Sequence, residues 1–531
     1  MNESQKKSRN RKLVWKKVAL IMLSAFMGFT LTTEGTVFPP PPRSSKVPVI
    51  VVHGMGGTPL YRKDENGNWV RAGSVAASTM MRLFRNDPGF LSNVFKLGSK
   101  DKFQEKEWNA LISGISEFAK TTDINCSPDG GPNGVGVRNY WTTPLSEHPD
   151  YFDYDNGVTR IAKELCLENG YDNVYAYNYD WRLDLYDSGA NGLDHFIHEV
   201  MRQTGAKKVT LVCDSLGGAT VNCYLDAHKN DDVLDRVIIV NGALEGVDFA
   251  SAFTESLYAS PTEISQYLKQ LGTSLNGGKY EILFFAGSAM FSGMLNTLSE
   301  NLNNGLEENH IQKRIFLECF HPIFGNIPAI YECIPYKDFD ESMEKMTSIG
   351  FLQKDSELYN KLQQFHIAQG HAEQNLKDVH RRGVQVAIIA SYGYPGIPLT
   401  RNCRKQTDIL IETEYMSAGA TVAYSGEKLP LRPGKYKSAD REIDASTCAL
   451  PDSTWFIKNL RHVDFEVGTP AMKFIAGLSL GYYDCNLESV QKSTGYSQFL
   501  LADSHQNLTN ITPNNTGDPG RLMAIRPSRR N

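Results

Sequence analysis

A serine stands where a run of apolar residues gives way to small ones. The segment VTLVCDSLGGATVNCYLD, residues 209–226, predicts a buried strand, then Ser215, then a helix. Such a turn lifts the hydroxyl above the sheet, and the helix N-terminus favours the negative charge that develops when the serine attacks a carbonyl. Cys213 and Gly217 are small enough to let strand and helix pass closely. The segment predicts a nucleophilic serine, and the alternative is that Ser215 only caps the helix.

A second turn can supply backbone N–H groups to a negatively charged substrate oxygen. The segment VPVIVVHGMGG, residues 47–57, predicts a buried strand that ends in a glycine-rich turn. A serine nucleophile of this kind needs two N–H donors, one after the serine and one after the first core strand. Leu216 and Met55 are the expected donors of this oxyanion hole. A dinucleotide-binding loop is excluded, because it requires a third glycine where Pro59 stands.

The serine also needs a histidine to take its proton and an acid to orient that histidine. In strand–serine–helix enzymes the order along the chain is serine, acid, histidine. His462 ends TWFIKNLRH, the last predicted strand, and is the expected base. The acid should follow the preceding core strand, and Asp440 is preferred because it leads into a short segment before the last strand. Asp408 and Asp444 remain alternatives, and neither Asp408 nor Asp440 is followed by the glycine that is common after this acid.

The elements that must position these residues alternate along the chain. Short apolar, β-branched runs are typical of buried strands in a parallel sheet, and helical patterns lie between several of them. The predicted fold class is therefore α/β, with a mostly parallel sheet and helices on both faces. The predicted strands lie within residues 47–57, 174–181, 208–215, 236–242, 384–393 and 454–462.

The strand pattern is interrupted between residues 247 and 380, which we interpret as a cap, or lid, inserted into the core. Its segment EILFFAGSAMFSGML, residues 281–295, is apolar enough to contact a membrane surface through Phe284 and Phe285, and burial against the core is the alternative. The predicted organisation is a signal peptide or signal anchor (1–35), a proline-rich linker (36–46), core parts (47–246 and 381–502), the cap (247–380) and a disordered tail (503–531).

Charge is unevenly distributed along the chain. Residues 1–17 carry seven basic side chains and one acidic one, whereas the whole chain has a net charge of -5. The acidic remainder excludes broad binding to a nucleic-acid backbone. The apolar run at 18–31 is too short for the hydrocarbon core of a bilayer and predicts a secretory signal, with an uncleaved anchor as the alternative. The expected location is the secretory pathway or the extracellular space, where Asn507, Asn510 and Asn514 are glycosylation sequons.

The cysteines and histidines give no pattern of a metal or redox site. The nine cysteines include no C-x-x-C pair, and the chain has neither HExxH nor a clustered Cys/His set. No metal and no organic cofactor are expected. In an exported chain Cys319 and Cys333 are the expected disulfide pair, and Cys213 is the expected free thiol.

Four segments carry a resemblance to a known family: VPVIVVHGMGG, NYDWRLD at 178–184, CDSLGG, and ASYGYPGIPL before the acid region. On these the chain resembles the lecithin:cholesterol acyltransferase family, which includes lysosomal phospholipase A2 and phospholipid:diacylglycerol acyltransferase. The resemblance spans roughly residues 47–465. It implies an α/β-hydrolase fold, an acyl-enzyme mechanism on lipid esters, and a cap that holds acyl chains.

The expected activity is therefore transfer of an acyl group from a phospholipid or another glycerolipid to a lipid alcohol. Hydrolysis should continue when no alcohol is supplied, because a serine acyl-enzyme does not itself choose between water and an alcohol. Two alternatives stay open. One is a plain lipase or esterase, and the other is a catalytically silent protein of hydrolase fold that binds lipid.

Overall fold

The structure is a computed structural model that describes residues 47–72, 104–119, 122–138, 140–251, 309–397, 403–431, 434–462 and 464–516. The predicted signal or anchor, the linker, and the apolar segment 281–295 lie outside the described residues. Within the described parts, no helix combines the length and the apolar character needed to cross a bilayer.

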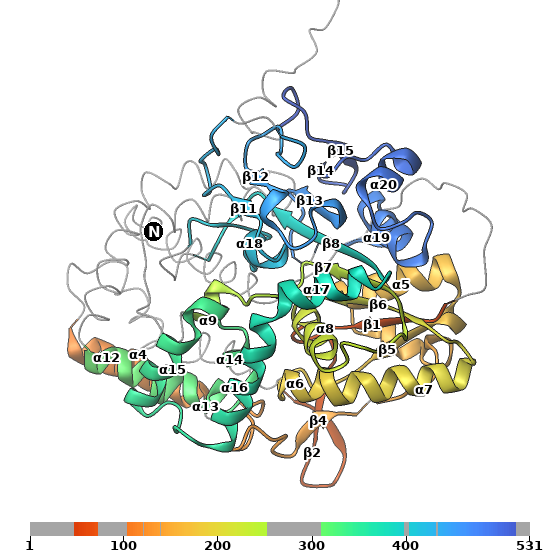
Figure 1. Ribbon diagram of the computed structural model, residues 1–531. Coiled ribbons are helices and arrows are strands. Elements are labelled where there is room, and N and C mark those ends of the chain that lie inside the picture. The colour runs from red at the N-terminus through yellow and green to blue at the C-terminus, as the bar shows by residue number, and fades with distance from the viewer. Residues whose placement is uncertain are drawn as a thin grey trace, which may run out of the picture. The chain divides into compact units, whose positions relative to one another are not determined.

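An eight-stranded sheet organises the described chain, with the strand order β15-β14-β13-β8-β7-β6-β1-β5 (Figure 1). All neighbours pair in parallel except β14 and β15, which are antiparallel. Each predicted strand run overlaps one of these strands, so the predicted mostly parallel sheet is confirmed. The strands are β1(Val49–Val52), β5(Val174–Tyr177), β6(Val209–Asp214), β7(Leu234–Val240), β8(Gln385–Tyr392), β13(Thr454–Lys458), β14(Phe499–Ala502) and β15(Leu508–Asn510).

Helices cover both faces of this sheet, as the uninterrupted apolar strands require. Successive side chains of a strand point to opposite faces. In β1, Val49 and Val51 join the hydrophobic cluster that includes residues of α5(Gly157–Asn169), α19(Pro470–Leu480) and α20(Leu487–Thr494). Ile50 and Val52 join the cluster of α7(Asp194–Thr204), α8(Leu216–Ala227), α16(Glu357–Gly370) and α17(Ala372–Arg381). All four β1 side chains are buried, which explains why the strand reads as a continuous apolar run.

Register brings the functional segments to one edge of the sheet. Val52 of β1 lies beside Cys213 of β6, and Asp214 lies beside Val240 of β7. The carboxyl ends of parallel strands therefore meet, and the turn that contains Ser215 starts at this edge. Ligands of open α/β sheets bind at this edge.

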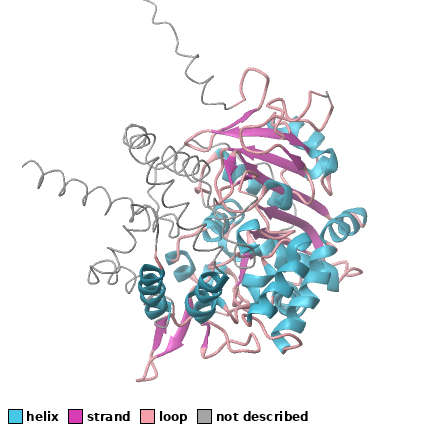
Figure 2. Ribbon diagram, turned by 90° about the vertical axis from the view of Figure 1, so that its left-hand side faces the viewer, coloured by secondary structure: helices cyan, strands magenta, loops and turns pink. Residues whose placement is uncertain are grey.

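Shorter elements complete the described chain, and Figure 2 shows the small sheet of β2, β3 and β4 together with the helices. The remaining helices are α4(Glu105–Ala119), α6(Leu185–Asp187), α9(Asp248–Ser251), α12(Asn309–Arg314), α13(His321–Phe324), α14(Pro328–Glu332), α15(Phe339–Ile349) and α18(Thr413–Met416), with the π-helical segments η4(Ser188–Leu193) and η5(Ile315–Phe320). The remaining strands are β2(Leu60–Lys63), β3(Trp69–Arg71), β4(Val135–Val137), β9(Tyr394–Pro395), β10(Gln406–Thr407), β11(Thr421–Val422) and β12(Ile443–Asp444).

The last two helices before β8 belong to the layer over the sheet. Asn222 of α8 donates to the carbonyl oxygen of Ala368 in α16, 2.8 Å away, and accepts from Asn375 of α17 at 3.0 Å. These buried hydrogen bonds tie α16 and α17 to the helix that follows Ser215. The insertion of a cap at 247–380 stays a prediction, and its C-terminal part is packed on α8.

The predicted disorder of the tail is wrong for residues 503–516. Leu508 pairs with Ala502 across the antiparallel β14 and β15, and Leu508 and Ile511 are buried. The polar composition that suggested disorder belongs to an edge strand, in which Thr509 and Asn510 are exposed. Residues 517–531 lie outside the described chain.

The expected disulfide is also wrong. All nine cysteines are free and buried. Cys319 packs with Trp108 and Ile311, whereas Cys333 lies in the large hydrophobic cluster on one face of the sheet. Their closeness in sequence was misleading, because the two thiols are parts of different clusters. Cys213 is free, as expected.

Candidate active site

Ser215 occupies the predicted strand–serine–helix turn. Its backbone has φ 58° and ψ -127°, a conformation that residues with a side chain rarely adopt. Hydrogen bonds hold it there: its N–H donates to Val240, and its carbonyl oxygen accepts from Gly218 and Ala243. Surroundings that fix such a conformation are typical of functional turns.

Glycines are needed on both sides of this turn because backbones approach closely. A Cβ atom on Gly217 would lie 2.4 Å from the carbonyl oxygen of Val52, and one on Gly54 would lie 2.5 Å from the Cβ atom of Ser215. Cys213, in contrast, fits where this turn usually has glycine. It is buried in β6 with its Sγ 3.6 Å from the carbonyl oxygen of Ile238.

The glycine-rich turn after β1 is anchored by side chains near the start of α5. Tyr154 donates its hydroxyl to the carbonyl oxygen of Gly56 at 2.9 Å, and the Asn156 side chain donates to that of Gly57 at 3.1 Å. Asn156 is also the N-cap of α5 and forms a capping box with Thr159. The anchoring therefore fixes the turn to an element of the core.

The two expected oxyanion donors flank Ser215 from separate segments. Leu216 is the first residue of α8, so its N–H has no acceptor within the helix. Met55 lies in the turn beside Gly54, which approaches Ser215. The assignment of Met55 and Leu216 as oxyanion donors stays a prediction. The position of the two segments on either side of Ser215 is consistent with it.

His462 connects Ser215 to an aspartate. Its Nε2 lies 2.9 Å from the Oγ of Ser215, and its Nδ1 lies 2.6 Å from the Oδ2 of Asp408. Ser215 directly follows β6, His462 lies after β13, and Asp408 directly follows β10 in the segment between β8 and β13. The structure therefore places Asp408 against His462, and the expectation that Asp440 lies there is wrong.

Asp408 is held in place by its own loop. Its Oδ1 accepts from the backbone N–H groups of Leu410 at 3.0 Å and Ile411 at 2.8 Å, and its carbonyl oxygen accepts from the N–H of His462 at 2.8 Å. Ile409 has φ 90°, a value usual for glycine. A β-branched residue thus adopts the conformation of the missing glycine, which hid the acid from sequence inspection.

The two other candidate acids bind lysines. Asp440 accepts from Tyr392 at 2.9 Å and forms an ion pair with Lys458 at 3.0 Å. Lys458 is buried at the end of β13, and a buried ammonium group needs a compensating carboxylate. Asp444 pairs with Lys437 at 2.9 Å. Neither carboxylate is among the hydrogen-bond or ion-pair partners of His462.

Burial and charge act on His462 in opposite directions. Burial lowers the pKa of its imidazole, but the charge of Asp408, the hydrogen bond to it and the charge of Asp214 raise that pKa to about 9. Asp214 precedes Ser215 and is itself buried. Burial raises the pKa of its carboxyl to about 7, with His462 opposing and Asp408 adding to the rise.

We expect kcat/KM for a soluble short-chain ester to increase with pH through the titration of His462, because Nε2 must be unprotonated to accept the serine proton. Asp214→Asn removes a charge that raises the pKa of His462, so the inflection should move to lower pH. Profiles of both proteins from about pH 5 to pH 10 test this expectation. An inflection that does not move would contradict it.

The same titration affects stability. The pKa of His462 in the folded state, about 9, lies above the ordinary value of 6.5, so the charged imidazole stabilises the fold. This contribution to the free energy of unfolding is fully present at pH values below the ordinary pKa. It is lost as pH rises through about 9.

The NYDWRLD block has a positioning role that its motif did not reveal. Tyr179 stacks on His53, with ring centroids 4.4 Å apart, and donates its hydroxyl to the carbonyl oxygen of His53. Thr220 of α8 donates to the same hydroxyl at 3.0 Å. Tyr179 thus links the segment before Met55 to the helix after Ser215.

Arg182 of the same block is fully buried. It pairs with Asp180 at 2.6 Å and donates to the carbonyl oxygens of Ile124 and Val135 at 2.8 and 2.7 Å. A buried charge with these partners fixes the loop that leads into β4. The sequence signal for this role is the pair of opposite charges, Asp180 and Arg182, within a block that also holds Tyr179 and Trp181.

Part of the chain is similar to a family of known proteins. Residues 151–327 match the model of the family described as lecithin:cholesterol acyltransferase. Over 246 residues the chain is 22% identical to phospholipase A(1) LCAT3 of Arabidopsis thaliana, which covers 39% of this chain and 48% of that protein. The chain thus spans about half the length of this curated relative. Among solved structures, the Tle4-Tli4 complex matches 66% of this chain and 75% of its own, with 11% identity and a TM-score of 0.28.

Proposed function

We propose that this chain, part of which matches the model of the lecithin:cholesterol acyltransferase family, is a serine-dependent enzyme that takes an acyl group from a glycerolipid ester. The observation that carries the proposal is the contact of Ser215 with His462 at 2.9 Å and of His462 with Asp408 at 2.6 Å. A serine is activated when its hydroxyl contacts an imidazole and that imidazole contacts a carboxylate.

The first half-reaction forms an acyl-enzyme. His462 Nε2 takes the proton from Ser215 Oγ as the oxygen attacks the ester carbonyl, and the Asp408 carboxylate stabilises the imidazolium that results. The N–H groups of Met55 and Leu216 bind the oxygen of the tetrahedral intermediate, each contributing about 3 kcal/mol in the transition state. When the intermediate collapses, the leaving alcohol takes the proton from His462 and the acyl group remains on Ser215.

The second half-reaction releases the acyl group to an acceptor. His462 removes a proton from water or from an alcohol, whose oxygen then attacks the acyl carbon and restores the Ser215 hydroxyl. Because bulk water is abundant, transfer to an alcohol requires a site that excludes water and orients the hydroxyl. The predicted cap would make that site, and its membrane-contacting segment, residues 281–295, stays a prediction.

A phospholipid is the acyl donor that we propose. The support is the likeness to a relative named phospholipase A(1), together with the family match. As acceptor we propose a lipid alcohol, with hydrolysis as the second activity when none is present. A plain lipase or esterase is the alternative that the following experiment distinguishes.

The test supplies vesicles of acyl-labelled phospholipid with and without diacylglycerol, a sterol or a long-chain alcohol. We expect free fatty acid in the absence of acceptor, and a labelled acyl ester at its expense when the right acceptor is present. Ser215→Ala should abolish both products and also labelling by a fluorophosphonate probe.

Each other outcome has a defined meaning. Free fatty acid alone, unchanged by every acceptor, would leave a hydrolase and refute transfer. A folded wild-type protein that neither reacts with the probe nor releases fatty acid would refute the enzyme altogether and favour a silent lipid-binding protein. Thermal unfolding of Ser215→Ala, compared with the wild type, shows that lost activity is not lost fold.

A further inference from the structure

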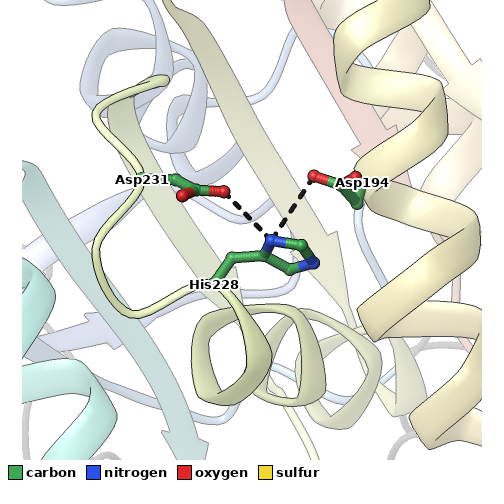
Figure 3. Close-up of side chains that lie close together, drawn as sticks. All are labelled: Asp194, His228 and Asp231. Atoms are coloured by element: carbon green, nitrogen blue, oxygen red, sulfur yellow. Dashed lines mark hydrogen bonds and ion pairs between the residues drawn. The ribbon is translucent and has the colours of Figure 1, made fainter.

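A histidine and two aspartates meet near the C-terminal end of α8 (Figure 3). His228 directly follows that helix, Asp231 lies in the loop after it, and Asp194 is the first residue of α7. One ligand atom from each residue lies within 4.8 Å of the others. All three side chains are partly buried, with 23%, 39% and 26% of the surface of His228, Asp231 and Asp194 exposed.

The hydrogen bonds of His228 indicate which ring nitrogen faces the carboxylates. Its Nε2 lies 2.6 Å from the carbonyl oxygen of Ala190 in η4, and a carbonyl can only accept, so Nε2 carries a hydrogen. Its Nδ1 faces the Oδ2 of Asp231 at 3.0 Å and the Oδ1 of Asp194 at 3.6 Å. Three electron-rich atoms converge, so a proton or a metal cation must lie among them.

Two buried polar atoms, one beside this cluster and one within it, make no hydrogen bond to the described residues. The Tyr224 side chain is only 1% exposed, and its buried hydroxyl makes no hydrogen bond to the described residues. Its ring stacks on that of His228, with centroids 4.9 Å apart, and its phenol experiences the charges of both carboxylates. The Oδ1 atom of Asp194 is likewise buried without a hydrogen bond among the described residues, and its contacts are the ion pairs with His198 and His228. A single proton on His228 leaves the Tyr224 hydroxyl unsatisfied.

We propose that Asp194, His228 and Asp231 bind a divalent transition-metal ion, with Zn²⁺ as the best-suited member of the class. A neutral imidazole with its other N–H fixed by a backbone carbonyl is the usual form of a metal-binding histidine. Two carboxylate oxygens and one imidazole nitrogen complete three positions of a tetrahedral site and balance the charge of the ion. The fourth position is open to a water, which the Tyr224 hydroxyl can bind.

Neighbouring groups define the surroundings of the site. His198 Nδ1 lies 3.2 Å from the Oδ1 of Asp194, but 53% of the His198 side chain is exposed. Arg382 donates to the backbone carbonyl oxygen of Asp231 at 3.0 Å, and its positive charge also acts on the Tyr224 phenol. The site joins the end of α8 to α7, and Ser215 lies at the other end of α8. The role is therefore structural, and it does not depend on the proposed acyl transfer.

The test measures metal binding to tag-free full-length protein that has been treated with a chelator and dialysed. We expect calorimetry with ZnCl₂ to give one ion per chain and the melting temperature to rise with zinc concentration. CoCl₂ should give a visible spectrum of a site with nitrogen and oxygen ligands. Ser215→Ala should bind zinc as the wild type does, which separates this proposal from the catalytic one.

Three variants test the assignment. Asp231→Asn and His228→Gln each remove a ligand and should weaken zinc binding by more than the roughly 10–100-fold that loss of an outer partner causes. Asp231 lies on a surface loop, so its substitution carries the least risk to the fold. The matched control is His371→Gln, because His371 also lies 2.9 Å from an aspartate of α8, Asp226, but faces no second carboxylate in the described structure. It should leave zinc binding unchanged.

Two results would overturn the proposal. One is a wild type that binds no zinc at about millimolar concentration, which would make the cluster an ion pair between imidazolium and the two carboxylates. The other is binding that persists with unchanged affinity in both ligand variants.

Discussion

Replacing Asp408 by asparagine is expected to lower kcat/KM about ten-thousandfold while the protein stays folded. In the wild type, Asp408 accepts hydrogen bonds from the N–H groups of Leu410 at 3.0 Å and Ile411 at 2.8 Å. The Asn side chain keeps an oxygen that can accept both. It no longer offers a carboxylate to His462, so it favours the wrong tautomer and cannot stabilise the imidazolium. Steady-state kinetics with a soluble ester, normalised to folded protein, measure the effect.

Asp440→Asn is the matched control for this prediction. Asp440 contacts Lys458 and Tyr392, and Glu442, which lies 2.9 Å from Lys458, remains as a second carboxylate for that ammonium group. We expect some loss of stability, because a buried ion pair is weakened, and activity per folded molecule within about tenfold of the wild type. The opposite result, an inactive Asp440→Asn and an active Asp408→Asn, would show that Asp440 is the acid of the triad.

Replacing Arg182 by methionine is expected to reduce the free energy of unfolding by about 3–5 kcal/mol. The Arg182 side chain is fully buried, and only 8% of the Asp180 side chain is exposed, so the substitution leaves a buried carboxylate whose charge is no longer balanced. It also removes the donor that reaches the carbonyl oxygens of Ile124 and Val135. Urea unfolding of the two proteins gives the difference.

Arg62→Met serves as the comparison for Arg182. Arg62 pairs with Asp123 at 2.6 Å, but 38% of its side chain is exposed to water. A solvent-exposed pair of this kind contributes about 0–1 kcal/mol, so the expected loss is small. If both variants lose the same free energy of unfolding, burial is not the reason why the Arg182–Asp180 pair stabilises the fold.

The sequence by itself determined six of the eight strands of the sheet and the serine turn. The β-branched runs became β1, β5, β6, β7, β8 and β13, because strands covered on both faces are apolar at every position. Ser215 could be found because its turn needs small residues, and Gly217 lies where any Cβ atom would meet the carbonyl oxygen of Val52. His462 could be found because it follows the last of the long apolar strands. These signals are local, so they can be read along the chain.

The tertiary structure decided which acid meets the histidine. Asp408 and Asp440 both follow β8 in sequence, and neither precedes a glycine. The choice depends on the charge that each carboxylate must balance: Lys458 is buried beside Asp440, and His462 is buried beside Asp408. Ile409, with φ 90°, adopts the backbone that glycine would have marked.

Contacts between distant segments were equally hidden from the sequence. His228 and Asp231 are close along the chain, but Asp194 comes from a different helix and reaches them because η4, the segment that leads into α7, packs against α8. Cys319 and Cys333 show the reverse, since near neighbours in sequence became parts of separate hydrophobic clusters. Local patterns fix where strands and turns form, because backbone geometry and burial act over a few residues. Pairings between side chains depend on how whole elements pack, so only the folded chain reveals them.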